Sequence, residues 1–310
     1  NKMKKITLLY ISACLALSSC YKLDTAPYNQ VSGNTFWQTE DQALAGVLGI
    51  YNDLKKEGTF GIQFAYDDLT DVGIGYDVGL GDIIAGTFTD RTGTVTSRWK
   101  SGYDLIQRAN HAISNIQKME IDAQKKNIMI SEAKFLRGLM YFQLSNLFGG
   151  VPIYDESVDL NKDFADLKNP RSSLADVQKF IVDDLTFAIE NLPVKYDEKY
   201  TGRVTKGAAV ALRGKVYLYQ KNWANAIKDF EDIVYNKTAS YNYSLSSDYS
   251  ALFKMEGDNS AEAIFSIQNM GGTGFPYGMP LAFYMGSRST FGSCWNNVMP
   301  STRFADSYEN

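Results

Sequence analysis

Residues 210–230 read VALRGKVYLYQKNWANAIKDF, and this stretch decides the fold. Two small residues, Gly214 and Ala226, let paired helices approach each other closely. Two aromatic residues, Tyr217 and Phe230, follow them along the chain and can fill the space between the helices. The stretch therefore predicts two helices that pack as a hairpin.

The spacing G-x-x-Y followed by A-x-x-x-F matches the tetratricopeptide pattern. Three positions depart from that pattern. Arg213 stands where leucine is expected, Val210 where tryptophan is expected, and Thr238 replaces the closing proline. An earlier helix pair beginning at residues 131–148 fits loosely, although residues 149–171 interrupt it. A generic helical hairpin is therefore the alternative interpretation.

Further helices are predicted where apolar side chains recur at helical spacing. One of these helices is expected to end at Gly149, because glycine favours the backbone conformation that closes a helix. The next is expected to begin at Ser173, which can form a capping box with Asp176. The apolar positions are Ala43, Val47, Ile50 and Leu54; Tyr103, Ile106, Ala109, Ile113 and Ile116; Ala133, Leu136, Met140, Leu144 and Leu147; and Val177, Ile181, Leu185, Ala188 and Leu192.

Two segments have the composition of loops. Residues 58–96 are rich in glycine, aspartate and threonine, and residues 271–298 are rich in glycine and aromatic residues. Loops of this length within a compact domain are usually functional or disordered. Residues 261–268 alternate and contain β-branched side chains, so we expect a strand there. The fold class is therefore mainly α, a tetratricopeptide-like helical repeat scaffold with long irregular loops and little β-structure.

The N-terminus has the features of a secretory signal. Three lysines precede an apolar run over residues 6–17, which is shorter than the ~20 residues that span a bilayer. The run ends in Leu-Ser-Ser-Cys at residues 17–20, which resembles a bacterial lipobox. We therefore expect residues 1–19 to be a signal peptide, Cys20 to carry a palmitate-type lipid anchor, and residues 20–38 to be a tether. An ordinary signal with an incidental cysteine is the alternative.

The composition excludes several functions. The net charge is −4, and nucleic-acid binding requires a basic face, so no nucleic-acid partner is expected. His111 is the single histidine, which cannot build a multi-histidine metal site, and we predict neither a metal nor another cofactor. After signal removal only Cys20 and Cys294 would remain, so no disulfide framework is expected.

Several sequence blocks follow one another along the remaining chain. They are Leu23-Asp24 with Pro27, Phe36-Trp37, Trp99 with Tyr103, Arg108-Ala109-Asn110, residues 132–137, residues 148–152, Pro170-Arg171-Ser172, Asp183-Asp184-Leu185, residues 202–209 and residues 262–268. In this order the blocks resemble the SusD/RagB family of nutrient-binding outer-membrane lipoproteins. Each block alone is weak, whereas the ordered set is specific and covers nearly the whole mature chain.

The resemblance implies a fold, a location and a partner. It implies a helical domain over residues 39–268 and, at residues 269–310, the start of a loop-rich C-terminal region. Members of this family are longer, so the chain is expected to be truncated. The resemblance also implies lipid anchoring at the cell outer membrane, facing outwards. The implied partner is a SusC-like TonB-dependent transporter, and the implied ligand is an oligosaccharide or a peptide bound without catalysis.

Candidate ligand-binding residues come from the two loop segments. Sugars present apolar C–H faces and rims of hydroxyl groups, so a site for them needs aromatic platforms together with carboxylates or arginine. Loops on a rigid scaffold are the usual place for such groups. The candidates are Asp68, Asp71, Tyr76 and Asp77 from the first segment, and Tyr277, Tyr284, Arg288 and Trp295 from the second. By contrast, Trp37, Trp99 and Trp223 lie at helix entrances, and we expect them to be packing residues.

Three other functions are open. A glycoside hydrolase could use two carboxylates from the cluster between Asp67 and Asp82, but that chemistry needs a defined separation and a raised pKa on one member. A calcium loop could use the same oxygens, although the EF-hand spacing is absent. An adaptor that binds proteins through tetratricopeptide repeats would need a regular repeat throughout, which the two loop segments contradict.

Overall fold

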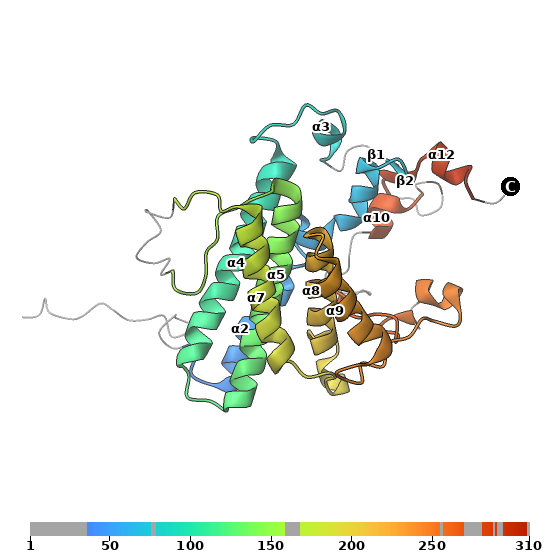
Figure 1. Ribbon diagram of the computed structural model, residues 1–310. Helices are drawn as coiled ribbons and strands as arrows, with labels where there is room; N and C mark the ends of the chain where they lie inside the picture. The colour runs from blue at the N-terminus through green and yellow to red at the C-terminus, as the bar shows by residue number, and fades with distance from the viewer. Residues whose placement is uncertain are drawn as a thin grey trace, which may run out of the picture.

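The computed structural model describes residues 36–75, 79–158, 168–254, 257–269, 281–287, 289 and 294–308, and these are mainly helical (Figure 1). The longer helices are α2 (Glu40–Asp53), α4 (Gly93–Lys118), α5 (Ala123–Phe148), α7 (Leu174–Asn191), α8 (Lys206–Tyr219) and α9 (Trp223–Tyr235). Short helices are α3 (Gly81–Ile84), α10 (Leu281–Met285) and α12 (Thr302–Ala305). The strands are β1 (Gly73–Gly75) and β2 (Val298–Pro300).

Neighbouring helices in the chain are also neighbours in space. Helix α4 packs against α5, α5 against α7, α7 against α8, and α8 against α9 (Figure 1). Helix α2 lies against both α4 and α5. Such nearest-neighbour stacking of helices is the architecture of a helical repeat scaffold, so the predicted fold class is confirmed. One continuous core runs through the layers, from Ala43 in α2 to Val216 in α8.

The helix boundaries follow the predicted signals. The Ser173 hydroxyl accepts a hydrogen bond from the Asp176 amide and caps the start of α7. Gly149 closes α5 with a φ of 71°, a left-handed value that favours glycine. Asn222 separates α8 from α9, and its side chain accepts from the amide of Asn225. Within the described ranges, no helix combines the length and the apolarity needed to cross a bilayer.

The hairpin of α8 and α9 has the predicted packing. A Cβ atom placed on Gly214 would lie 2.7 Å from Cε1 of Phe230, so only glycine admits the ring there. Arg213, which replaces the expected leucine, donates from Nε and Nη2 to the two carboxylate oxygens of Asp229 at 2.8 Å each. An ion pair therefore joins the two helices at the position where the repeat pattern has an apolar contact.

Replacing Gly214 by alanine is expected to lower the free energy of unfolding by about 1–3 kcal/mol, because the added methyl group overpacks the contact with Phe230. Urea denaturation followed by circular dichroism measures the change. Gly138→Ala is the matched control, since a Cβ there meets Ile181 and Leu185 at an ordinary 3.7 Å. Equal stability of the two variants would contradict the close approach.

Two expectations are wrong. Residues 261–268 do not form a strand, because no other strand in the described chain pairs with them. Instead, the Ala261 carbonyl accepts from the Ser244 amide, and the Ala263 amide donates to the Ser260 carbonyl. Trp223 is not a packing residue: its side chain is 55% exposed, on the same outer face of α9 as the exposed Ile227. Trp37 and Trp99 do pack against the core, as expected.

A buried carboxylate ties α5 to the segment before α8. The Glu132 side chain is fully buried, and its Oε2 accepts from the hydroxyl of Tyr51 at 2.6 Å and from Nε of Arg203 at 3.1 Å. Its Oε1 accepts from Nη2 of Arg203 and from the hydroxyl of Tyr196. We call these four side chains the Glu132 cluster.

A second buried polar group lies between α4, α5 and α7. Arg137 donates to both carboxylate oxygens of Asp184, to Glu156 and to the Asn110 side chain. Lys134 also donates to Asp184. We call these five side chains the Arg137 cluster. Burial alone would raise the pKa of the Glu156 carboxyl, but the charge and hydrogen bond of Arg137 and the charge of Lys134 lower it to about 2.

Candidate functional site

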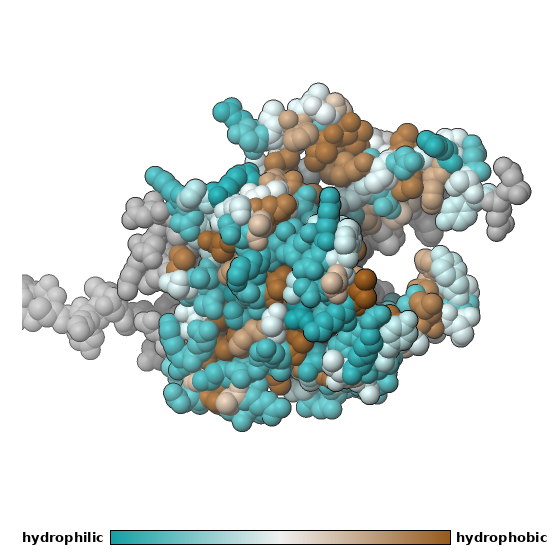
Figure 2. All heavy atoms as spheres, viewed as in Figure 1, coloured by the Kyte–Doolittle hydropathy of each residue, from teal (hydrophilic) through white to brown (hydrophobic). Residues whose placement is uncertain are grey.

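The two predicted loop segments meet at one end of the scaffold. Strands β1 and β2 pair antiparallel, with Ile74 opposite Met299. Ala65, Leu80 and Val298 form a small separate core beneath them. We call the described residues 57–75, 79–92, 281–287 and 294–308 the loop lobe. Figure 1 shows it beside the upper ends of the long helices, and Figure 2 shows hydrophobic side chains gathered over α3 and β1.

Four aromatic side chains, Phe64, Phe283, Tyr284 and Trp295, form an aromatic cluster in the loop lobe. The Tyr284 ring lies 5.7 Å from the ring of Phe64 and 5.5 Å from that of Trp295. The Trp295 ring also meets Phe283 edge-on at 5.2 Å and is 45% exposed. A backbone hydrogen bond positions two of these rings, since the backbone amide of Trp295 donates to the Phe283 carbonyl at 2.7 Å.

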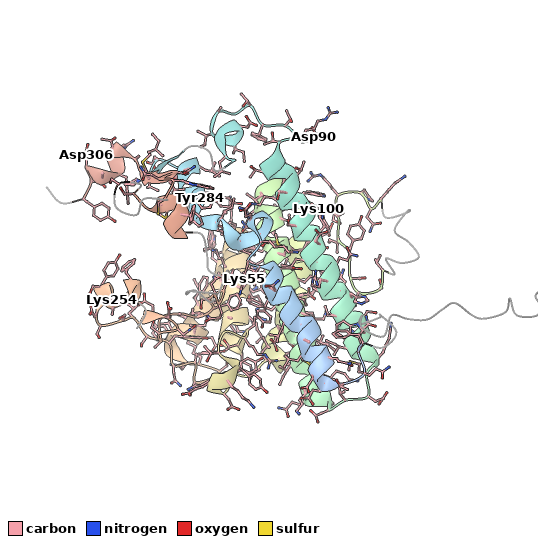
Figure 3. All side chains as sticks on the ribbon, turned by 180° about the vertical axis from the view of Figure 1, so that it is seen from behind. Lys55, Asp90, Lys100, Lys254, Tyr284 and Asp306 are labelled. Carbon is pink, nitrogen blue, oxygen red and sulfur yellow. The ribbon has the colours of Figure 1, made fainter. Side chains whose placement is uncertain are left out.

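A pocket of about 300 Å³ opens beside the aromatic cluster. It lies between the turns that follow α2, the first turns of α4, and α10. Figure 3 labels Tyr284 where α10 approaches the scaffold. We call this space the Tyr284 pocket. Its lining residues are Glu57, Gly58, Ile62, Phe64, Ala65, Gly79, Gly93, Thr94, Ser97, Arg98 and Tyr284.

Arg98 is the charged group at the base of the Tyr284 pocket, and only 3% of it is exposed. Its Nη1 donates to the carbonyl oxygen of Thr59, and its Cζ lies 4.6 Å from the centre of the Tyr66 ring. Its Nε and Nη2 have no hydrogen-bond acceptor in the part of the chain that the structure describes. Burial lowers the pKa of Arg98, and the Tyr66 hydroxyl acts in the opposite direction.

Sequence reasoning missed Arg98. The residue precedes Trp99 in the first half of α4 and resembles any polar residue on a helix surface. Its burial arises only when the turns after α2 fold over it, since Thr59 and Tyr66 lie more than thirty residues earlier in the chain. The sequence shows the Tyr66 ring and the start of α4, but it does not show that Arg98 of α4 contacts that ring.

The structure brings together only part of the predicted site. Tyr284 and Trp295 are in contact within the aromatic cluster. Asp71 is exposed just before β1, where its backbone carbonyl accepts from the Ser301 hydroxyl at 2.6 Å. Asp68 does not line the Tyr284 pocket. The remaining predicted site residues lie outside the described residues: Cys20, Tyr76, Asp77, Tyr277 and Arg288.

Asp68 is buried. Only 5% of it is exposed, and neither carboxylate oxygen has a hydrogen-bond partner within the described ranges. A Cβ on Gly75 would lie 2.0 Å from Oδ2 of Asp68, so glycine is required beside the carboxylate. Burial raises the pKa of Asp68, and the negative charge of Asp67 raises it further.

A pair of hydrolytic carboxylates is not present in the described residues of the Tyr284 pocket, where Glu57 is the single acidic side chain. Asp67 and Asp82 are exposed, and one oxygen of Asp82 accepts from Thr87. A group of three or more acidic, histidine or cysteine side chains that could hold a metal ion is also absent from the described ranges. Asp77, which the hydrolase and calcium interpretations also used, lies outside those ranges.

Comparison with known protein families gives one extended match. Residues 23–218 match the model of a SusD-like family described as starch-binding and associating with the outer membrane. Among curated proteins, SusD-like protein P2 of Formosa agariphila is 28% identical over 97% of this chain and 61% of its own length. The chain therefore spans about three-fifths of that relative.

Solved structures give the same likeness. A SusD-like carbohydrate-binding protein from Bacteroides fragilis is 25% identical with a TM-score of 0.76, over 89% of this chain and 54% of that one. A structure described as a laminarin-binding SusD-like protein is 27% identical with a TM-score of 0.65, over 74% of this chain and 51% of that one. The chain thus spans about half of each of these two proteins.

Proposed function

This chain belongs to the SusD/RagB family, and from this membership we propose that it binds an oligosaccharide nutrient without catalysis at the Tyr284 pocket. The bound nutrient would pass to a SusC-like TonB-dependent transporter in the outer membrane. Relatives described as carbohydrate-binding and laminarin-binding support a sugar ligand over a peptide. A peptide ligand is the alternative.

The aromatic cluster is the observation that carries this proposal. Sugar rings stack their C–H faces on aromatic side chains, and hydroxyl groups beside the platform hold their rims. Trp295 provides an exposed ring, Tyr284 lines the adjoining pocket, and the side chains of Thr94 and Ser97 add hydroxyl groups. Both rings belong to the loop lobe, and ligand sites usually lie on such segments beside a rigid scaffold.

Replacing Trp295 by alanine is expected to weaken oligosaccharide binding about three- to tenfold, because the exposed platform is removed. Tyr284→Ala is expected to act in the same direction. Isothermal titration calorimetry against a panel of oligosaccharides, laminari-oligosaccharides among them, measures the change. Trp223→Ala is the matched control, since this exposed tryptophan lies on α9, outside the loop lobe. Unchanged affinity for both loop-lobe variants would reject the proposed site.

Absence of catalysis is a separate part of the proposal. The acidic side chains of the described loop lobe do not form a pair across the Tyr284 pocket, which supports binding over hydrolysis. Prolonged incubation of the protein with each oligosaccharide that it binds is expected to release no reducing ends. Release that disappears in Glu57→Gln or Asp68→Asn would favour the hydrolase instead.

Replacing Cys20 by alanine is expected to abolish lipid labelling and to move the protein from the membrane fraction to the soluble fraction, because the acyl chains provide the anchor. Metabolic labelling with a palmitate analogue and cell fractionation measure the two effects. Cys294→Ala is the matched control, since this cysteine is buried within the loop lobe. Labelling that persists without Cys20 would reject the anchor.

A further inference from the structure

Arg98 differs from the other well-buried arginines of the described chain. Arg137, Arg203 and Arg213 are each partly or fully buried, and each donates two hydrogen bonds to a carboxylate. Arg98 is buried to a similar degree but has one backbone carbonyl and one ring face as partners. A guanidinium group stays charged in proteins, so its positive charge is not neutralised by any described residue.

An unpaired buried charge is unfavourable. Taking a guanidinium group out of water removes its hydration, and a single carbonyl and an aromatic face restore only part of that stabilisation. A negative group nearby would restore the rest, as Asp184, Glu132 and Asp229 do for the other arginines. The Tyr284 pocket is the open space beside Arg98, so a ligand in the pocket can supply that negative group.

We infer that the Tyr284 pocket prefers an acidic saccharide, one whose carboxylate or sulfate ester lies at the unneutralised charge of Arg98. This inference rests on the proposed function, because it specifies the chemistry of the same ligand. Carboxylates and sulfate esters share the feature that matters, an anionic group with several acceptor oxygens. The aromatic cluster then stacks on the sugar, and Arg98 selects its charge.

Glu57 is the other charged side chain that lines the pocket, and it opposes this preference. Its side chain is exposed, so water and salt screen its charge. Arg98 is shielded from water, so its field in the pocket is screened much less. The potential at the base of the pocket is therefore positive, with a weaker negative contribution at the rim.

The preference can be measured with two matched pairs of ligands. One pair is a laminari-oligosaccharide and its sulfated derivative, and the other is an oligogalacturonate and its methyl ester. In calorimetry on the full chain at low salt, at least one acidic member is expected to bind about tenfold more tightly than its neutral partner. The preference is expected to shrink only slightly as salt is raised, because Arg98 is shielded from water. Preference for the sulfated member, the carboxylated member or both identifies the group.

Variants assign the preference to Arg98. Arg98→Gln is expected to bring the two members of a pair to similar affinity. Glu57→Gln is expected to strengthen binding of the acidic member a fewfold, and this surface change tests the inference even if Arg98→Gln folds poorly. Lys100→Gln is the control, because it removes a positive charge from the exposed side of α4, outside the pocket.

The outcomes separate the inference from the proposed function. Neutral members that bind as tightly as acidic members would overturn the inference and leave the oligosaccharide function standing. An acidic preference that survives Arg98→Gln, or that Lys100→Gln reduces as much, would also overturn it. Failure of every saccharide to bind would reject the proposed function together with the inference.

Discussion

Replacing Arg137 by methionine is expected to lower the free energy of unfolding by about 3–5 kcal/mol, because it removes the guanidinium that pairs with two carboxylates and leaves Lys134 as their single remaining counter-ion among the described residues. Only 1% of Arg137 is exposed. Its Nε and Nη2 lie 2.7 Å from the two oxygens of Asp184, and its Nη1 lies 2.6 Å from Glu156. Methionine fills a similar volume, so the loss reports the charge and the hydrogen bonds and not a cavity.

Lys179→Met is the matched control for this variant. Lys179 forms an exposed pair with Asp183 one turn along α7, with the two atoms 2.6 Å apart. Exposed pairs of this kind contribute about 0.3–0.5 kcal/mol, so we expect a change of that size. Urea denaturation at neutral pH measures both variants. A loss within 1 kcal/mol of the control would mean that the Arg137 cluster is not a major source of stability.

The same cluster predicts how stability depends on pH. The pKa of Glu156 lies at about 2 in the folded protein, below its ordinary value of 4.5 in the unfolded chain. The unfolded state therefore binds more protons between these values. The contribution of Glu156 is fully present above about pH 4.5 and is lost as the pH falls towards 2. Arg137→Met is expected to flatten this part of the stability curve, which denaturation at a series of pH values measures.

Replacing Glu132 by leucine is expected to cost a similar 3–5 kcal/mol. The change leaves the Arg203 guanidinium half-buried without a counter-ion, and it removes the acceptor of the Tyr51 hydroxyl. The pKa of Tyr51 lies well above its ordinary value, through burial first and then through the negative charge of Glu132. The hydroxyl therefore stays protonated at neutral pH and needs an acceptor there.

The double variant Glu132→Leu with Arg203→Met distinguishes a paired charge from general loss of packing. Removing both charges eliminates the uncompensated guanidinium, so the double variant is expected to be more stable than Glu132→Leu alone. Urea denaturation of the two single variants and the double variant gives the coupling free energy. Losses that simply add would show that the two side chains do not stabilise each other.

Local signals in the sequence were sufficient for the scaffold. Each of three predicted features depends on a few nearby residues, and the structure has all three. They are the helix cap at Ser173, the helix end at Gly149 and the close helix approach at Gly214. The strand expected at residues 261–268 failed because a strand needs a partner, and alternation in one segment does not supply one. The prediction that Trp223 packs was wrong because helical spacing does not indicate which face of α9 another helix covers.

The site was only partly predictable for a related reason. Tyr284 and Trp295 were chosen as aromatic platforms in a glycine-rich segment, and the structure places the two rings in contact. Asp68 was chosen as a carboxylate for sugar hydroxyl groups, but it is buried next to Gly75 of β1. Arg98 could not be chosen, because its environment is made by residues from separate turns. The type of a candidate side chain is written in the sequence, whereas its exposure depends on contacts between distant segments.

The pairing of β1 with β2 has a consequence for the order in which the molecule matures. The Ser301 hydroxyl beside β2 donates to the carbonyl of Asp71, a partner 230 residues away in the chain. Closing so long a loop costs more entropy than joining successive helices, so the helical hairpins are expected to assemble first, as the chain is made. The aromatic cluster can form only after β2 has been synthesised and has paired with β1. Ligand recognition at the Tyr284 pocket would thus come after the assembly of the helical scaffold.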